Sequence, residues 1–285
     1  MKLATYLSSQ GPRAAVVAAN GLVDLNQADA NLPSDVKSLL NQEADIARAQ
    51  AVAESTFHQP LGEVRLLSPI QAPQKILCVG ANYADHAAES GMAIPEEPII
   101  FSKFATALCG PEDNILLPKV GAKVDYEAEL VAVIGKQGKN ISQSEAMSHV
   151  AGYCSGHDVS ARDWQKGKPG GQWTLGKGFD NFAPLGPYLV TPEEAGDPNN
   201  LRVQMRLNGE TMQDSNTSQF IFKIDFLISY ISNICTLMPG DLLYTGTPPG
   251  VGFARKPPVL LKDGDVCEVE IENLGVLRNP VVMER

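Results

Sequence analysis

The sequence predicts a mixed, mainly β fold that closes like a barrel, with a small N-terminal module ahead of one large domain. Helical patterns are too few and too irregular for a doubly wound sheet, and several apolar runs have the length of strands. An Asn-Gly pair after an alternating run adds a clear hairpin signal. The chain of 285 residues is long enough for this arrangement.

The beginning of the chain predicts the small module. The runs LATYL, AAVVAA and GLVDLN indicate short strands, and residues 34–54 indicate a helix. After Pro69 and Pro73 the strands become longer and their connections richer in glycine. We therefore place a boundary near residue 70, between a small α+β module (1–70) and a large C-terminal domain (71–285).

The large domain contains several segments that predict regular elements. The alternating run LRVQMRL leads into Asn208-Gly209, and YEAELVAVIG is apolar on both faces apart from its acids, as a central strand should be. Ser142 and Glu145 form a capping box before a short helix. The predicted elements are the strands KILCVG (75–80), EPIIFSKF (97–104), YEAELVAVIG (126–135), LRVQMRL (201–207) and CEVEIE (267–272), and the amphipathic helix FKIDFLISYISNIC (222–235).

Composition excludes several classes of protein. A formal net charge of −10 disfavours nucleic-acid binding, because such a surface repels phosphates. The five cysteines include no CxxC spacing, which favours reduced thiols over a disulfide framework or a zinc site. Neither a signal peptide nor an apolar run of roughly 20 residues is evident, so we expect no membrane association and a cytoplasmic location.

Two glutamates in the predicted central strand are the most informative residues. Glu127 and Glu129 are two positions apart and therefore share one face of the strand. At roughly 7 Å their carboxylates repel by about 2 kcal/mol at an effective dielectric of 20, and burial adds to that cost. A cation, a shared proton or arginines could compensate, and oxygen ligands suit Mg²⁺ or Mn²⁺, with Ca²⁺ also compatible. Asp125 competes as a ligand by its spacing, and a solvated strand end is the plain alternative.

A second acidic position lies in GHDVSARDWQ. Asp158 ends an apolar strand just before Arg162 and Gln165, and strand ends that feed loops often carry chemistry. The alternative is structural: Asp158 caps a helix and Arg162 pairs with a surface acid.

Three further candidates carry weaker signals. His86 and Glu89 are spaced to share one helical face, where the carboxylate would make the imidazole a general base; an exposed helix pair is the alternative. Lys177 lies in the glycine-rich WTLGKGFD and could stabilise an enolate or remain a solvated lysine. TGTPPGVG is a rigid turn that offers the Thr247 hydroxyl and lacks the spacings of nucleotide-binding loops.

Taken together, these segments resemble the fumarylacetoacetate hydrolase family. The matching stretches occur in the family's order over about residues 75–285, and the combination is very specific. The ending RKPPVLLKDGD and the N-terminal module look most like the subgroup called fumarylacetoacetate hydrolase domain-containing protein two, with its bacterial relatives. The stretches are NYADHAAE, PIIFSKF, DYEAEL, GHDVSARDWQ, QWTLGKGFD and PGDLLYTGTPPGVG.

The resemblance implies a distorted β-barrel roll, a homodimer, and a Mg²⁺ or Mn²⁺ site. It assigns the metal to Glu127, Glu129 and Asp158, which leaves Asp125 a structural role. It also implies that the stretch KGKPGGQ (166–172) sets substrate choice. The remaining assignments are a catalytic dyad of His86 and Glu89, and substrate contacts from Arg162, Gln165, Lys177 and Thr247.

These assignments support one main expectation and two alternatives. The main expectation is metal-dependent hydrolysis of a C–C bond in an acylpyruvate-like (1,3-diketo) 2-oxo acid, with His86 activating water and Lys177 holding the enolate. The closest alternative is an oxaloacetate keto–enol tautomerase or decarboxylase that uses the same site. A non-catalytic 2-oxo acid binding protein is the alternative from another class, and the dyad of His86 and Glu89 argues against it because chelation needs no base.

Overall fold

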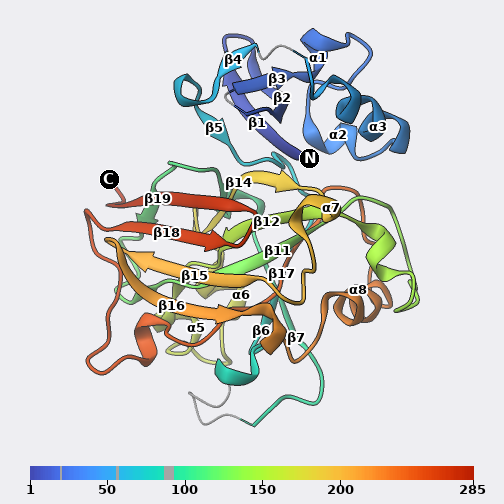
Figure 1. The fold of residues 1–285 in the computed structure, drawn as a ribbon. Coiled ribbons are helices and arrows are strands. Elements are labelled where there is room, and N and C mark those ends of the chain that lie inside the picture. The colour runs from blue at the N-terminus through green and yellow to red at the C-terminus, as the bar shows by residue number, and fades with distance from the viewer. Residues whose placement is uncertain (20, 56–57, 87–92) are drawn as a thin grey trace.

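The computed structural model describes residues 1–19, 21–55, 58–86 and 93–285. Its fold is mainly β, as the sequence predicts, and the large domain rolls its strands around one core (Figure 1). Most neighbouring strands are antiparallel, whereas β17 with β6, β14 with β8 and β19 with β9 are parallel, so the sheets are mixed.

The largest sheet runs through both parts of the chain. Within the described ranges it has 12 strands, and the N-terminal strands extend it beyond the central ones. In spatial order it contains β4 (Gln59–Pro60), β3 (Gly21–Asp24), β2 (Gly11–Val17), β1 (Lys2–Ser8), β14 (Ala183–Val190), β12 (Val150–His157), β11 (Ala128–Ile134), β17 (Leu242–Tyr244), β6 (Ile76–Gly80) and β7 (Ile99–Lys103), with β5 (Leu66–Leu67) on β1 and β8 (Leu108–Cys109) on β14.

A second sheet lies across the first in Figure 1. The predicted hairpin forms here, and its two central residues, Asn208 and Gly209, have φ of 53° and 83°. Positive φ at both positions is what a type I′ turn requires, which explains the Asn-Gly pair. The strands are β16 (Glu210–Asn216), β15 (Arg202–Leu207), β18 (Val266–Ile271), β19 (Gly275–Met283) and β9 (Ile115–Leu117), and a separate pair joins β10 (Val124–Asp125) to β13 (Ser160–Ala161).

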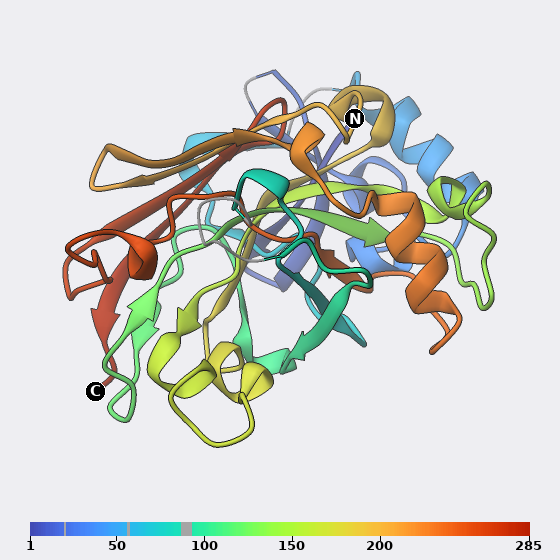
Figure 2. The ribbon, with the colours of Figure 1, turned by 90° about the horizontal axis from the view of Figure 1, so that it is seen from below.

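Helices are short and lie at the edges of the sheets. The single helix expected over 34–54 is wrong, because Gln42 adopts an extended conformation (φ −133°, ψ 114°) and divides it into α2 and α3. In Figure 2, α8 (orange) lies at the right of the view, whereas α5 and α6 (yellow-green) lie at the bottom. The helices are α1 (Leu25–Ala28), α2 (Val36–Leu39), α3 (Glu43–Val52), α5 (Arg162–Gln165), α6 (Trp173–Lys177), α7 (Pro192–Ala195) and α8 (Ile224–Ser232), with 3-10 turns η1 (Leu61–Glu63), η2 (Ala105–Ala107), η3 (Ala146–His149), η4 (Thr217–Gln219) and η5 (Gly252–Ala254).

The central strand β11 positions the candidate site. All seven of its residues are buried between β12 and β17. Its antiparallel register pairs Ala128 with His157 and Glu129 with Gly156. The residues just before β11 and just after β12 therefore meet at one end of the sheet, where the backbone N–H of Asp158 donates to the carbonyl of Glu127 at 2.9 Å.

The boundary near residue 70 stays a prediction. The N-terminal strands gather at one end of the molecule in Figure 1, yet β1 is hydrogen bonded to β14 of the large domain. Across the described ranges, every helix is too short or too polar to span a bilayer. The five cysteines, all within those ranges, are free thiols.

Replacing Gly156 should destabilise the fold. A Cβ at this position would lie 2.3 Å from Val131 Cγ2 and 2.7 Å from Tyr244 Cε1, in a fully packed layer. We expect Gly156→Ala to lower the free energy of unfolding by about 1–3 kcal/mol, measured by chemical denaturation. Gly62→Ala is the control, because a Cβ there meets nothing within 4 Å. Equal stabilities of the two variants would contradict this account of the packing.

Candidate active site

Three acidic side chains meet where β11 begins and β12 ends. One carboxylate oxygen each from Glu127, Glu129 and Asp158 lie within 4.8 Å of one another, and all three residues are buried. Glu127 precedes β11, Glu129 lies in it and Asp158 follows β12, so the antiparallel register brings the three together. We call these residues the acidic triad.

Two cations from the short helices α5 and α6 contact the triad. Lys177 Nζ donates to Glu127 Oε2 at 2.8 Å and to Asp158 Oδ2 at 2.5 Å. Arg162 Nη2 lies 2.6 Å from Glu127 Oε1. Both cations are buried, so little water screens these ion pairs.

Asp125 lies apart from the acidic triad and holds Arg162 instead. Its Oδ2 accepts from Arg162 Nε at 2.8 Å and lies 2.7 Å from Nη2. Its Oδ1 accepts the backbone N–H groups of Tyr126 at 2.9 Å and Gly252 at 2.8 Å. The geometry therefore gives Asp125 a positioning role, although spacing alone made it a competing ligand.

Lys103 is a site residue that sequence reasoning missed. Its side chain is fully buried, and Nζ lies 2.7 Å from Asp158 Oδ1. Nζ also donates to the carbonyls of Val159, Lys177 and Phe182 at 3.0, 2.6 and 2.6 Å. The available signal was a lone charge in the apolar run PIIFSKF, since a buried lysine needs partners.

Four buried acids and three buried cations give this cluster a formal net charge of −1. Burial, then Asp158 and Glu127, raise the pKa of Glu129 well above its usual value, whereas Gly246 N–H, at 2.8 Å from Oε2, lowers it. Burial alone would raise the pKa of Glu127 too, but Lys177 and Arg162 outweigh it and the pKa falls. The buried acids are Asp125, Glu127, Glu129 and Asp158, and the buried cations are Lys103, Arg162 and Lys177.

A divalent cation fits this cluster. The three clustered oxygens are hard ligands of the kind Mg²⁺, Mn²⁺ and Ca²⁺ prefer, and the charge left over is negative. Two lysines and an arginine already offset the charge of three of the four buried carboxylates. The particular effect of a bound metal ion would therefore be to stabilise the ionised form of Glu129. The identity of the metal stays a prediction.

A cavity of about 410 Å³ opens beside the triad, and Glu127 is the triad residue that lines it. Arg162 Nη1 donates to Gln165 Oε1 at 2.9 Å, which fixes both side chains at the wall. Thr247 Oγ1 donates to the Ala128 carbonyl at 2.9 Å and accepts from Gln213 Nε2 at 2.9 Å, so its hydroxyl is also held. The sequence-predicted residues that line the cavity are His86, Glu127, Arg162, Gln165, Lys177 and Thr247.

His86 is the histidine that the structure places at this cavity. Its side chain is half-buried, and its backbone N–H donates to Asp85 Oδ1 at 2.9 Å. Glu89, the predicted partner of His86, lies outside the described residues. His157 adjoins the triad, but burial and then Lys103 lower its pKa to about 3. Because His157 remains neutral at physiological pH, it cannot serve as an acid there, and His86 is the better candidate.

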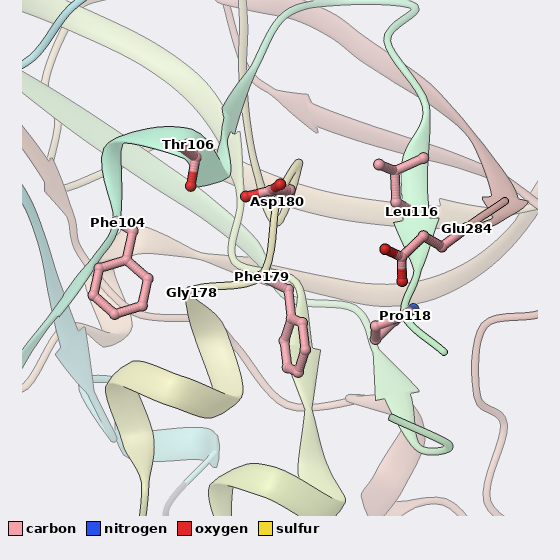
Figure 3. Close-up of a pocket in the computed structure, with 8 residues that line it drawn as sticks. All are labelled: Phe104, Thr106, Leu116, Pro118, Gly178, Phe179, Asp180 and Glu284. Carbon is pink, nitrogen blue, oxygen red and sulfur yellow. The ribbon is translucent and has the colours of Figure 1, made fainter. Parts of the chain in front are cut away.

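A separate hollow is lined in part by residues 178–180, which directly follow Lys177. Figure 3 shows that aromatic rings and the carboxylates of Asp180 and Glu284 surround it. None of its lining residues is a lysine, arginine or histidine, so it offers no side-chain cation for an anionic substrate. We therefore place the active site in the cavity beside the triad.

A β-roll with a buried carboxylate triad, beside a cavity that cations and a histidine line, has the features of an enzyme active site. Residues 75–282 match the family described as fumarylacetoacetate (FAA) hydrolase, C-terminal. The chain belongs to this family, which confirms the resemblance seen in its motifs.

Curated relatives resemble the chain over nearly all its length. The cattle protein named oxaloacetate tautomerase FAHD2A, mitochondrial (Bos taurus), is 52% identical over 95% of this chain and 88% of its own. The human protein of the same name (Homo sapiens) is 49% identical with the same coverage.

Solved structures of similar fold cover the whole chain. A 5-carboxymethyl-2-hydroxymuconate delta-isomerase from Mycobacterium smegmatis has a TM-score of 0.80 at 36% identity, covering 100% of both chains. A maleylpyruvate hydrolase from Sphingobium sp. SYK-6, in complex with manganese(II) and pyruvate, has a TM-score of 0.84 at 28% identity, also covering 100% of both.

Two expectations from the sequence are corrected by these comparisons. Hydrolysis of an acylpyruvate-like compound is contradicted, because relatives that are about 50% identical in sequence are named oxaloacetate tautomerases. Tautomerisation of oxaloacetate was the alternative expectation. The cytoplasmic location is contradicted as well, since the same relatives are named mitochondrial. The expectation of an enzyme is confirmed, and that of a homodimer stays a prediction.

Removing one triad carboxylate should abolish metal binding. We expect the protein to bind one Mn²⁺, and Glu129→Gln to weaken that affinity by more than the roughly 10–100-fold that loss of an outer partner costs. Calorimetric titration with MnCl₂ measures both. Asp180→Asn is the control, because this carboxylate lies in the separate hollow. Unchanged Mn²⁺ affinity in Glu129→Gln would exclude the triad as the site.

The raised pKa of Glu129 predicts how stability depends on pH without metal. Above its ordinary pKa of 4.5, the folded state holds a proton that the unfolded chain has released. Stability should therefore fall as pH rises from about 4.5 toward the raised pKa. Glu129→Gln lacks this loss, so the difference between variant and wild type in chelator should grow with pH. Denaturation curves across pH measure it, and a difference that stays constant would contradict the shifted pKa.

Proposed function

We propose that this enzyme interconverts the enol and keto forms of oxaloacetate. The observation that carries the proposal is that His86, two buried cations and Glu127 of the acidic triad line one cavity, so a proton carrier and groups that stabilise an enolate converge. The names of the relatives at about half identity support the choice of oxaloacetate.

The reaction requires one proton to leave and another to arrive. Going from enol to keto, the O2 hydroxyl loses its proton while C3 gains one; in the reverse direction C3 loses a proton and O2 gains one. No water adds, and no C–C bond breaks. The site therefore needs to stabilise the enolate between these two steps, and it needs a group that carries a proton to or from C3.

The enolate would be stabilised by positive charge around O2. A divalent ion held by Glu127, Glu129 and Asp158 would supply Lewis-acid polarisation of the 2-oxo group when bound. The solved relative with manganese(II) and pyruvate supports Mn²⁺ or Mg²⁺ in this role. Lys177 remains an ammonium, because Asp158 and Glu127 outweigh the effect of burial and raise its pKa.

Substrate orientation would come from Arg162. Its guanidinium is locked by Asp125 and Gln165 at the cavity wall, so it can receive the C1 carboxylate without reorganisation. Thr247, whose hydroxyl is fixed by Gln213, would support the same end of the substrate.

The proton at C3 is assigned to His86. Two other histidines lie away from the cavity: His58 Nδ1 accepts the backbone N–H of Asp24 at 3.0 Å, and His149 Nδ1 lies 2.9 Å from the Lys136 carbonyl. His157 stays neutral in the core. Within the part of the chain that the structure describes, His86 alone of the histidines lines the cavity.

Replacing His86 should separate catalysis from metal binding. We expect His86→Ala to lower kcat for oxaloacetate tautomerisation by about 100-fold or more, because a positioned acid–base group contributes on that order. Its Mn²⁺ affinity should stay close to wild type, because His86 is not in the triad. The decay of the enol's ultraviolet absorbance, with Mg²⁺ or Mn²⁺ present, measures the rate.

His58→Gln is the matched control, since this histidine lies just before β4 and does not line the cavity. Full activity of His86→Ala would refute the assignment of the proton carrier. Absence of any tautomerase activity in the wild-type protein, with metal bound, would refute the proposed function itself.

A further inference from the structure

Two of the three cations that line the cavity already have carboxylate partners. Arg162 is paired with Asp125 and Glu127, and Lys177 with Glu127 and Asp158. Lys166 also lines the cavity, and within the described residues it makes no ion pair. Among the described residues it is therefore the cavity cation without a carboxylate partner in the protein.

Lys166 is held at the cavity by its backbone and by an aromatic ring. It directly follows α5, and its N–H donates to the Arg162 carbonyl at 3.0 Å. Its Nζ lies 5.4 Å from the centroid of the Phe253 ring, which also lines the cavity. The cation–π contact keeps the ammonium beside the cavity without neutralising its charge.

The surroundings of Lys166 favour an incoming anion. Lys166 is exposed to solvent, and partial burial and then the charge of Arg162 lower its pKa. A carboxylate beside it would offset both effects. The cavity is also lined by apolar side chains, among them Ile99, Val251 and Ala254, which offer such a carboxylate no partner, so a polar or charged lining residue has to supply one.

We infer that Lys166 binds the distal carboxylate of the substrate and makes the cavity selective for dicarboxylic 2-oxo acids. This inference rests on the proposed function. The C1 carboxylate and the 2-oxo group of oxaloacetate would lie at the triad and Arg162, and the C4 carboxylate needs a second cation. Lys166 supplies it, because a second charge-assisted hydrogen bond then fixes both ends of a short ligand.

The chain contains a matched control two residues further on. Lys168 Nζ lies 4.6 Å from the centroid of the Trp164 ring, so it too makes a cation–π contact. Lys168 does not line the cavity. Lys166→Gln and Lys168→Gln thus remove the same charge from the same loop, and they differ in whether the charge faces the substrate.

The test compares oxaloacetate with its 4-ethyl ester, which keeps the 2-oxo acid end and lacks the distal charge. We expect the wild type to prefer oxaloacetate by about tenfold in kcat/KM, the size of effect that one charge-assisted hydrogen bond gives. Lys166→Gln should raise KM for oxaloacetate by about tenfold and leave the ester nearly unchanged. Lys166→Arg should keep the preference, Lys166→Glu should reverse it, and Lys168→Gln should match the wild type.

The outcomes separate this inference from the proposed function. A wild-type protein that does not tautomerise oxaloacetate refutes the function. An active wild type whose preference survives in Lys166→Gln overturns the inference alone. Equal losses on both substrates in Lys166→Gln also overturn it, because a structural role would not distinguish the acid from the ester.

Discussion

The site depends on how buried charge is balanced around the acidic triad. Four buried carboxylates share the interior with three buried cations, and the charge that remains falls on Glu129. Ion pairs from Lys177 and Lys103 hold Asp158, and Asp125 holds Arg162 against Glu127. Because each partner is buried, removing any one of them leaves an uncompensated charge, so the network forms as a unit. The same unit provides ligands for a metal and positive charge for an enolate.

The backbone register of two strands brings this network together. Pairing of Glu129 with Gly156 places the start of β11 beside the end of β12. Because Gly156 has no side chain, the Tyr244 ring from β17 can pack directly over it. Gly246, on the segment after β17, approaches Glu129 closely enough to donate its N–H. The rigidity of the central strands keeps the ligand oxygens close together before any ion arrives, which lowers the cost of binding.

Hydrolysis and tautomerisation place similar demands on such a site. Both pass through an enolate that a metal and a lysine can stabilise, and both use a histidine to move a proton. They differ in whether water attacks a distal carbonyl, and the residue types at the site do not encode that difference. Solved relatives of this fold include an isomerase and a hydrolase, so the shared scaffold leaves the reaction open. Residues of the cavity beyond the triad, such as Lys166, are therefore the place to look for what distinguishes the substrates.

By itself, the sequence determined the features that depend on local periodicity and turn chemistry. The alternation of β15, the Asn208-Gly209 turn and the apolar run of β11 follow from side-chain spacing, and the family motifs drew attention to Glu127, Glu129 and Asp158. Only the tertiary structure showed that Lys103 contacts Asp158, that Asp125 holds Arg162, and that the helix expected over 34–54 divides at Gln42. These features arise from contacts between segments far apart in the chain or from a single extended residue. Spacing along a sequence carries no information about which distant charge will be buried beside which.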